Sequence, residues 1–215
     1  ILVIIGMKET LEHKQSFSPS LLRVNPKDFY EPRVLGPSIT FLLTAFSFGI
    51  VLTIVPDLSK HLGINNKGVF FTVFVIASLV VRLLAGKASD RFGRVTVLKF
   101  SSLAIVVAML AIGMADSKSD FLFAAALFGL AVGTNSPTIF AWTIDLSDTK
   151  HRGKAMATMY IALEIGIGSG AFLSALVYDN QVENFYLAFW MGSCIAGIAL
   201  VYLLVWERYY AKKYV

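Results

Sequence analysis

The chain has 215 residues, of which 56% are hydrophobic and 15% are charged, and its formal net charge at pH 7 is +5. Soluble domains carry about 25% charged residues, so this composition excludes an ordinary soluble protein and favours a membrane protein. We interpret the positive charge as an excess of Lys and Arg on one membrane side, not as a nucleic-acid-binding surface. One cysteine, Cys194, excludes an internal disulfide, and three scattered histidines favour no metal site or other cofactor.

The first 34 residues differ from the rest of the chain. Residues 1–6 form a short apolar stretch without an initiator Met, which we interpret as the tail of a preceding transmembrane helix. Residues 7–34 are polar and contain Pro19, Pro26 and Pro32, so they are predicted to form a long cytoplasmic loop. The sequence is therefore expected to be a fragment of a longer chain.

Six apolar stretches follow this loop, and each is near the ~20 residues that a helix needs to cross a bilayer. Because lipid cannot satisfy backbone polar groups, these stretches are predicted to be helices. The expected fold is all-α, with a six-helix transmembrane bundle over 35–206 and a cytoplasmic tail over 207–215. The predicted spans are 35–55, 68–85, 95–115, 121–144, 155–178 and 185–206.

The basic residues predict the orientation of these spans. Sixteen of the 19 Lys and Arg residues fall on one side, and Lys60, Lys67 and Lys118 fall on the other. The side rich in basic residues is predicted to be cytoplasmic, which places the C-terminus inside the cell and the protein in the plasma membrane.

A charged motif lies between the second and third spans. It has the spacing G-x-x-x-D-R-x-G-R, with its fixed positions at Gly86, Asp90, Arg91, Gly93 and Arg94. This motif resembles the signature loop of the major facilitator superfamily of secondary transporters. The resemblance implies two six-helix halves joined by a basic loop, of which this chain would be the second half. Its implied partners are the lipid bilayer, the N-terminal half of the same polypeptide, a small-molecule substrate and protons.

The resemblance also implies a role for the motif as a cytoplasmic gate, in which charged groups stabilise one access state. The alternative is a loop that only sets topology and forms a turn. The segment from Asp145 to Ala155 resembles a second family signature, and we expect Asp145 to lie within salt-bridge reach of Arg91 or Arg94. The remaining gate candidates are Asp148, Arg152 and Gly153.

Glu164 is the one acid well inside an apolar span, roughly 14 Å from the start of that span. An ionisable group at this depth costs at least ~2.5 kcal/mol, so it is expected to face a cavity or a partner. It is a candidate for substrate contact or proton binding; the alternative is a structural hydrogen bond.

Four uncharged residues are further candidates for the substrate site. Asn135 and Ser136 belong to a polar patch before Pro137, and Thr44 and Ser47 lie in the span that borders the translocation path in the family. Each has a structural alternative, namely a hydrogen bond between helices or to its own backbone. Arg82 is expected to snorkel to the cytoplasmic interface.

Small residues recur at every fourth position in two spans, which predicts close helix packing. One stripe contains Ala125, Gly129, Gly133 and Pro137, and the other contains Ala162, Gly166, Gly170 and Ser174.

The function predicted from these features is alternating-access transport of a small organic solute, most simply proton-coupled efflux of a drug-like or amphipathic compound. With Glu164 in an apolar cavity, the compound could be cationic. The alternatives are uptake of a metabolite such as a sugar or organic acid, a homodimeric six-span scaffold or receptor-like subunit, and an intramembrane enzyme that pairs Glu164 with Asn135. No strong catalytic arrangement is visible, so the protein is not expected to be an enzyme.

Overall fold

The computed structural model describes residues 30–210, and the predicted segments 1–6 and most of 7–34 lie outside them. Six long helices follow a short 3-10 turn at Pro32–Val34, and each is apolar and long enough to cross a membrane. The six predicted spans and the all-α class are therefore confirmed. The helices are α2 (Leu35–His61), α3 (Val69–Phe92), α4 (Arg94–Gly113), α5 (Lys118–Leu146), α6 (Arg152–Tyr178) and α7 (Phe185–Tyr210).

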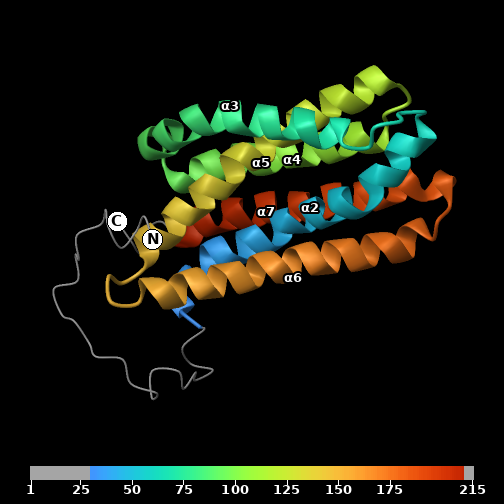
Figure 1. Cartoon of the computed structure of the whole chain (residues 1–215). Coiled ribbons are helices and arrows are strands. Elements are labelled where there is room, and N and C mark those ends of the chain that lie inside the picture. The colour runs from blue at the N-terminus through green and yellow to red at the C-terminus, as the bar shows by residue number, and fades with distance from the viewer. Residues whose placement is uncertain (1–29, 211–215) are drawn as a thin grey trace, which may run out of the picture.

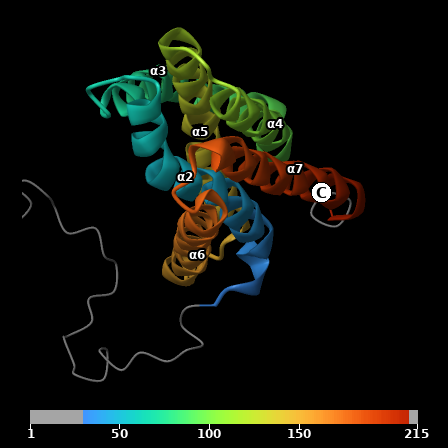
Figure 2. The same cartoon turned by 90° about the vertical axis from the view of Figure 1, so that its right-hand side faces the viewer.

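The helices run alternately up and down the bundle, so α2 begins and α7 ends at the same end, on the left in Figure 1. Packing follows the order α6, α2, α7, α4, α5, α3. The end view in Figure 2 shows the same arc, with α6 and α3 at its opposite limits. As the two outer helices, α3 and α6 are the least buried of the six spans.

The surface of this arc is apolar. Large exposed hydrophobic side chains include Leu79, Leu83 and Leu84 on α3 and Phe172 and Leu176 on α6. A soluble protein does not expose contiguous apolar surface along whole helices, whereas lipid tails solvate it. Together with the six spans, this surface identifies an integral membrane protein.

The helices extend beyond the apolar stretches that predict them. The predicted loop over 86–94 is wrong, because α3 continues to Phe92 and only Gly93 separates it from α4. Gly93 has φ +87°, a conformation that favours glycine, and it allows the sharp reversal between the two helices. Likewise α2 continues through Pro56 to His61. The added segments, 86–92 of α3 and 56–61 of α2, are rich in polar and charged residues, which hydropathy does not count as part of a span.

The small-residue stripes bring helices into backbone contact, as predicted. A Cβ atom at Gly166 or Gly170 would overlap a carbonyl oxygen of α2, that of Leu42 or Phe46. In the other stripe, a Cβ atom at Gly129 would overlap a carbonyl oxygen of α3. Glycine therefore permits the close approach of α2 to α6 and of α3 to α5.

Candidate functional site

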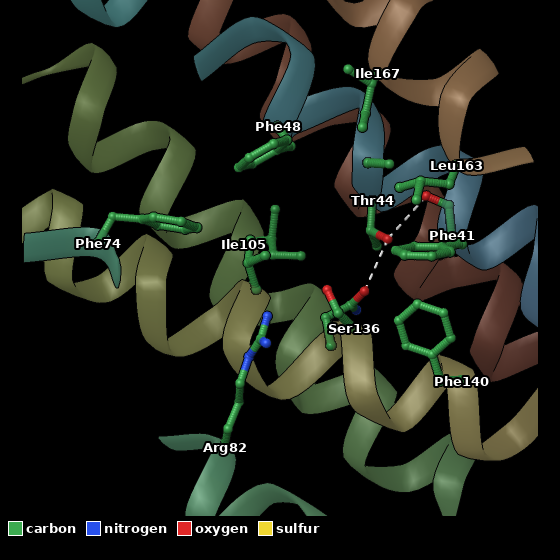
Figure 3. A pocket seen from close by; sticks show the side chains of 13 residues that line it. Phe41, Thr44, Phe48, Phe74, Arg82, Ile105, Ser136, Phe140, Leu163 and Ile167 are labelled. Carbon is green, nitrogen blue, oxygen red and sulfur yellow. Dashed lines mark hydrogen bonds between the residues drawn. The ribbon is translucent and has the colours of Figure 1, made fainter. Parts of the chain in front are cut away.

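A cavity of about 310 Å³ lies inside the arc of helices, and five helices, α2 to α6, contribute residues to its wall. Nine of its thirteen described lining residues are apolar, and four of these are phenylalanines. The polar residues are Thr44, Asn135 and Ser136, and the charged residue is Arg82 (Figure 3). The phenylalanines are Phe41, Phe48, Phe74 and Phe140.

The cavity has the character of a small-molecule site, with aromatic walls and a few placed polar groups. Its polar residues lie deep in the bundle. Asn135 is seventeen residues from Lys118 and eleven from Leu146, near the middle of α5. A solute in this cavity would therefore lie near the middle of the membrane-spanning helix α5.

Asn135 is buried in the cavity wall, and its side chain links three helices by hydrogen bonds. Its side-chain amide donates to Ser101 Oγ on α4 at 3.0 Å, and its Oδ1 accepts from Thr44 Oγ1 on α2 at 3.1 Å. The Thr44 hydroxyl also lies 2.9 Å from the carbonyl oxygen of Thr40. Because a hydroxyl has one proton, Thr44 donates either to Asn135 or to its own helix. Asn135 thus lines the cavity and also forms the interhelical hydrogen bonds that the alternative interpretation expects.

Arg82 is exposed and lines the cavity, and its position at the cytoplasmic interface stays a prediction. Its side chain rises from α3 into the cavity and points toward Ile105, as Figure 3 shows. α3 continues ten residues beyond Arg82 to Phe92, and the next charged residue, Lys87, follows Arg82 by five residues.

Two other candidates lie away from this cavity. Glu164 occupies the middle of α6 on an exposed face, whereas Leu163 and Ile167 of the same helix line the cavity. Ser47 is buried and donates from Oγ to the carbonyl oxygen of Gly192 at 3.3 Å, joining α2 to α7. The expectation of a cationic solute depends on Glu164 facing the cavity, and the described cavity contains Arg82 instead.

The motif between α3 and α4 forms a charged cluster at the end of the bundle where α2 begins. Arg94 Nε donates to Asp145 Oδ2 of α5 at 2.8 Å, and Arg94 Nη1 contacts both Asp90 and Ser89. The expected contact between Asp145 and Arg94 is therefore present. Since the Arg94 side chain is 22% exposed and Asp145 is 49% exposed, water can reach and separate the pair.

Arg91, another predicted partner for an acid, instead stacks over the Phe92 ring at 5.5 Å. Asp148 does not join Arg94 and lies 3.7 Å from Arg33, just before α2. The backbone N–H of Lys150 donates to Asp148 and lowers the pKa of its carboxyl below the ordinary value, with further help from Thr149 and the nearby charges.

The remaining gate candidates have simpler surroundings. Gly86 lies inside α3, and Arg152 and Gly153 lie exposed in the first turn of α6. Neither Gly86 nor Gly153 has an atom within 4 Å of the position that a Cβ would take. The charged cluster of the described residues thus consists of Arg94, Asp145, Asp90 and Ser89.

Sequence analysis missed the phenylalanines and Arg82 as members of the site. Apolar side chains occur facing lipid, in helix packing and in cavity walls, and helical spacing alone does not distinguish these surroundings. The signal for Arg82 was present, because an arginine that interrupts an apolar stretch of a predicted span is expected to face a cavity, water or a partner.

Comparisons with known proteins define the family. The family model described as Major Facilitator Superfamily matches residues 38–214, so this chain belongs to the Major Facilitator Superfamily of transporters. It is similar to Multidrug resistance protein 2 of Bacillus subtilis (strain 168), with 28% identity over 71% of this chain and 38% of that protein.

Other similar proteins carry different names. The 3-(3-hydroxy-phenyl)propionate transporter of Escherichia coli (strain K12) is 26% identical over 66% of this chain and 34% of its own. The crystal structure of the human organic anion transporter MFSD10 superposes with a TM-score of 0.68 at 18% identity, covering 82% of this chain and 48% of that chain, which supports the fold. The chain spans less than half the length of these relatives.

Proposed function

We propose that this chain is one half of a secondary transporter that moves a small amphipathic organic solute by alternating access, with efflux driven by protons. The observation that carries the proposal is the 310 Å³ cavity, because it combines aromatic walls and polar groups at mid-depth in a membrane-spanning bundle. The names of two relatives, a multidrug resistance protein and a hydroxyphenylpropionate transporter, agree with such a solute. Transport changes the location of the solute and breaks no bond.

The second half of the translocation path would come from the N-terminal part of the same polypeptide. The arc ends at α3 and α6, whose faces are the least buried. The match covers less than half of each of these relatives, which leaves room for a second six-helix unit. Following the charge distribution, the protein lies in the plasma membrane with the C-terminal end of α7 in the cytoplasm.

The cluster around Arg94 serves as the cytoplasmic gate. Its hydrogen bonds to Asp145 and Asp90 join α4, α5 and the end of α3 on the side assigned to the cytoplasm. These charge-assisted bonds stabilise one arrangement of the helix ends, and water can replace them when the halves rock.

Glu164 supplies the proton-binding group. An ionised carboxylate facing lipid at the middle of a helix is unfavourable, so the face of α6 that carries Glu164 meets protein or water in the complete transporter. Protonation of this carboxyl would remove the charge, and that change would couple proton movement to the access state.

Flux in proteoliposomes tests the proposal. Full-length protein is reconstituted, and movement of a fluorescent amphipathic dye is followed with and without a pH gradient. We expect gradient-dependent flux of chemically unchanged dye, and loss of its pH dependence in Glu164→Gln but not in Glu164→Asp. Flux in Glu164→Gln with the pH dependence of wild type would remove the proton role. Absence of gradient-dependent flux of any amphipathic compound would contradict the transporter proposal.

A further inference from the structure

Arg82 is an exposed cation within the apolar part of α3, and it lines the cavity. It lies thirteen residues after Val69 and five residues before Lys87, the next charged residue, or about 20 Å and about 7 Å along the helix. A charged group in an apolar membrane-spanning stretch is unfavourable unless it faces a cavity, water or a partner. Arginine cannot avoid this cost by becoming neutral, because it stays charged in proteins.

No described residue compensates this charge. Arg82 forms no ion pair or hydrogen bond with the part of the chain that the structure describes. Lys99, closer to the end of its helix, pairs with Glu207 at 2.6 Å, and Arg94 pairs with Asp145. In the described part of the chain, Lys99 and Arg94 therefore have acid partners, whereas Arg82 faces the cavity without one.

The rest of the cavity fits an anion that carries an aromatic group. No Asp or Glu is among the described lining residues, so Arg82 is the one charged residue of the described cavity wall. A guanidinium group donates two parallel hydrogen bonds to a carboxylate, and the low dielectric strengthens them. The four phenylalanines offer faces and edges for an aromatic ring. Ser136 and Asn135 add hydrogen-bonding groups for a second polar substituent.

We infer that Arg82 binds the acidic group of the transported solute, and that this solute is an amphipathic organic anion of the arylalkyl carboxylate class. The inference rests on the proposed transport function and specifies its substrate. A rival role for Arg82 is an ion pair with an acid outside the described residues, which would hold the transporter together and affect every solute equally.

Three probes with one carbon skeleton separate these roles. Full-length protein in proteoliposomes is tested with phenylpropionate, phenylpropylammonium and phenylpropanol, which share a phenylpropyl group and differ in charge. The variants are Arg82→Gln and Arg82→Lys, and Lys118→Gln is the matched control, because Lys118 is exposed at the far end of α5. Size-exclusion elution verifies folding of each variant.

We expect the wild-type protein to transport phenylpropionate in preference to the other two probes. Arg82→Gln should raise the KM for phenylpropionate by about tenfold or more, the loss typical of one charge-assisted hydrogen bond. Arg82→Lys keeps the charge without the bidentate geometry, so its KM for phenylpropionate should lie between those of wild type and Arg82→Gln. Transport of phenylpropanol should change by less than about twofold in both variants, since it carries no charge for Arg82 to bind. Lys118→Gln should match wild type for every probe.

Two results would overturn the inference. One is an equal loss of all three probes in Arg82→Gln, which would assign the residue to a structural ion pair. The other is preferred transport of phenylpropylammonium that Arg82→Gln leaves unchanged. Both results retain the transporter, whereas wild-type flux of no probe above protein-free vesicles would contradict the proposed function together with this inference.

Discussion

The contact between α2 and α6 provides the sharpest test of the packing. A Cβ atom at Gly170 would overlap the carbonyl oxygen of Phe46, which belongs to the backbone and cannot move without moving α2. Two glycines of α7 supply matched controls. At Gly192 the nearest atoms are the flexible ends of Met109 and Ile50, and at Gly197 nothing lies within 4 Å. The three substitutions to alanine add the same methyl group to three different surroundings.

The expected free energies follow from these surroundings. Forcing a methyl group into a packed contact costs about 1–3 kcal/mol, whereas Gly→Ala in an open helix position gains up to about 1 kcal/mol. Gly170→Ala should therefore lower the free energy of unfolding by about 1–3 kcal/mol, Gly192→Ala should change it little, and Gly197→Ala should raise it slightly. At about 3 °C per kcal/mol, the thermal midpoint of Gly170→Ala falls by about 3–9 °C.

Thermal unfolding of the full-length protein in detergent, followed by size-exclusion chromatography at one heating rate, measures these midpoints. The order expected is Gly170→Ala below Gly192→Ala, and Gly192→Ala below Gly197→Ala. Equal midpoints for the variants at Gly170 and Gly197 would refute the argument, because they would mean that α2 and α6 are not in backbone contact at Phe46.

Three further predictions concern the cytoplasmic end. Arg94→Gln and Asp145→Asn should each lower dye flux, and exchanging the two charges should restore part of it; an exchange variant no better than either single variant would count against the gate. Because the pKa of folded Asp148 is depressed, its stabilisation is present above the unfolded pKa, and is lost as pH falls through the folded value. The thermal-midpoint difference between wild type and Asp148→Asn should therefore be present at about pH 5 and above, begin to shrink near about pH 4, and vanish only at lower pH, below the depressed folded pKa. Glu207→Gln should destabilise the protein more than Lys99→Met, because it leaves the partly buried Lys99 ammonium unpaired. Equal thermal midpoints for these two variants would show that the ion pair contributes little to stability.

Hydrophobicity predicts the number of helices and their centres, but not their ends. The span predicted at 68–85 belongs to a helix that continues to Phe92, because Lys87, Ser89 and Asp90 are polar yet compatible with helix. Hydropathy indicates which residues can face lipid, whereas backbone hydrogen bonding determines where a helix ends. Gly93 marks the true end, and its positive φ is the local signal.

Site residues of a type that is rare in apolar spans could be predicted from the sequence, whereas site residues of a common apolar type could not. Asn135 is conspicuous in an apolar span, and it lies in the cavity wall. Glu164 is equally conspicuous but lies on the exposed face of α6, since composition reveals depth in the membrane and not the direction of a side chain. Phe74 and Phe140 come from helices far apart in sequence, and only the arc of packed helices brings them to one cavity.

Asn135 itself distinguishes a binding residue from a packing residue. If Asn135 is replaced by Ala, Ser101 can still donate to the carbonyl oxygen of Leu98 and Thr44 to that of Thr40. Both hydroxyl donors keep a backbone acceptor, so the cost should be about 1 kcal/mol for the lost hydrogen bonds, plus a small cavity term.

Loss of solute binding would be a separate effect. If Asn135 binds the solute, Asn135→Ala should raise the KM for a hydroxyphenylpropionate by more than that for phenylpropionate, because only the former carries a phenolic hydroxyl for the amide to bind. Thermal unfolding and KM measured on the same protein preparation separate the two roles. A large fall in thermal midpoint with equal KM changes for both solutes would show that Asn135 joins helices α2, α4 and α5 and does not recognise the solute.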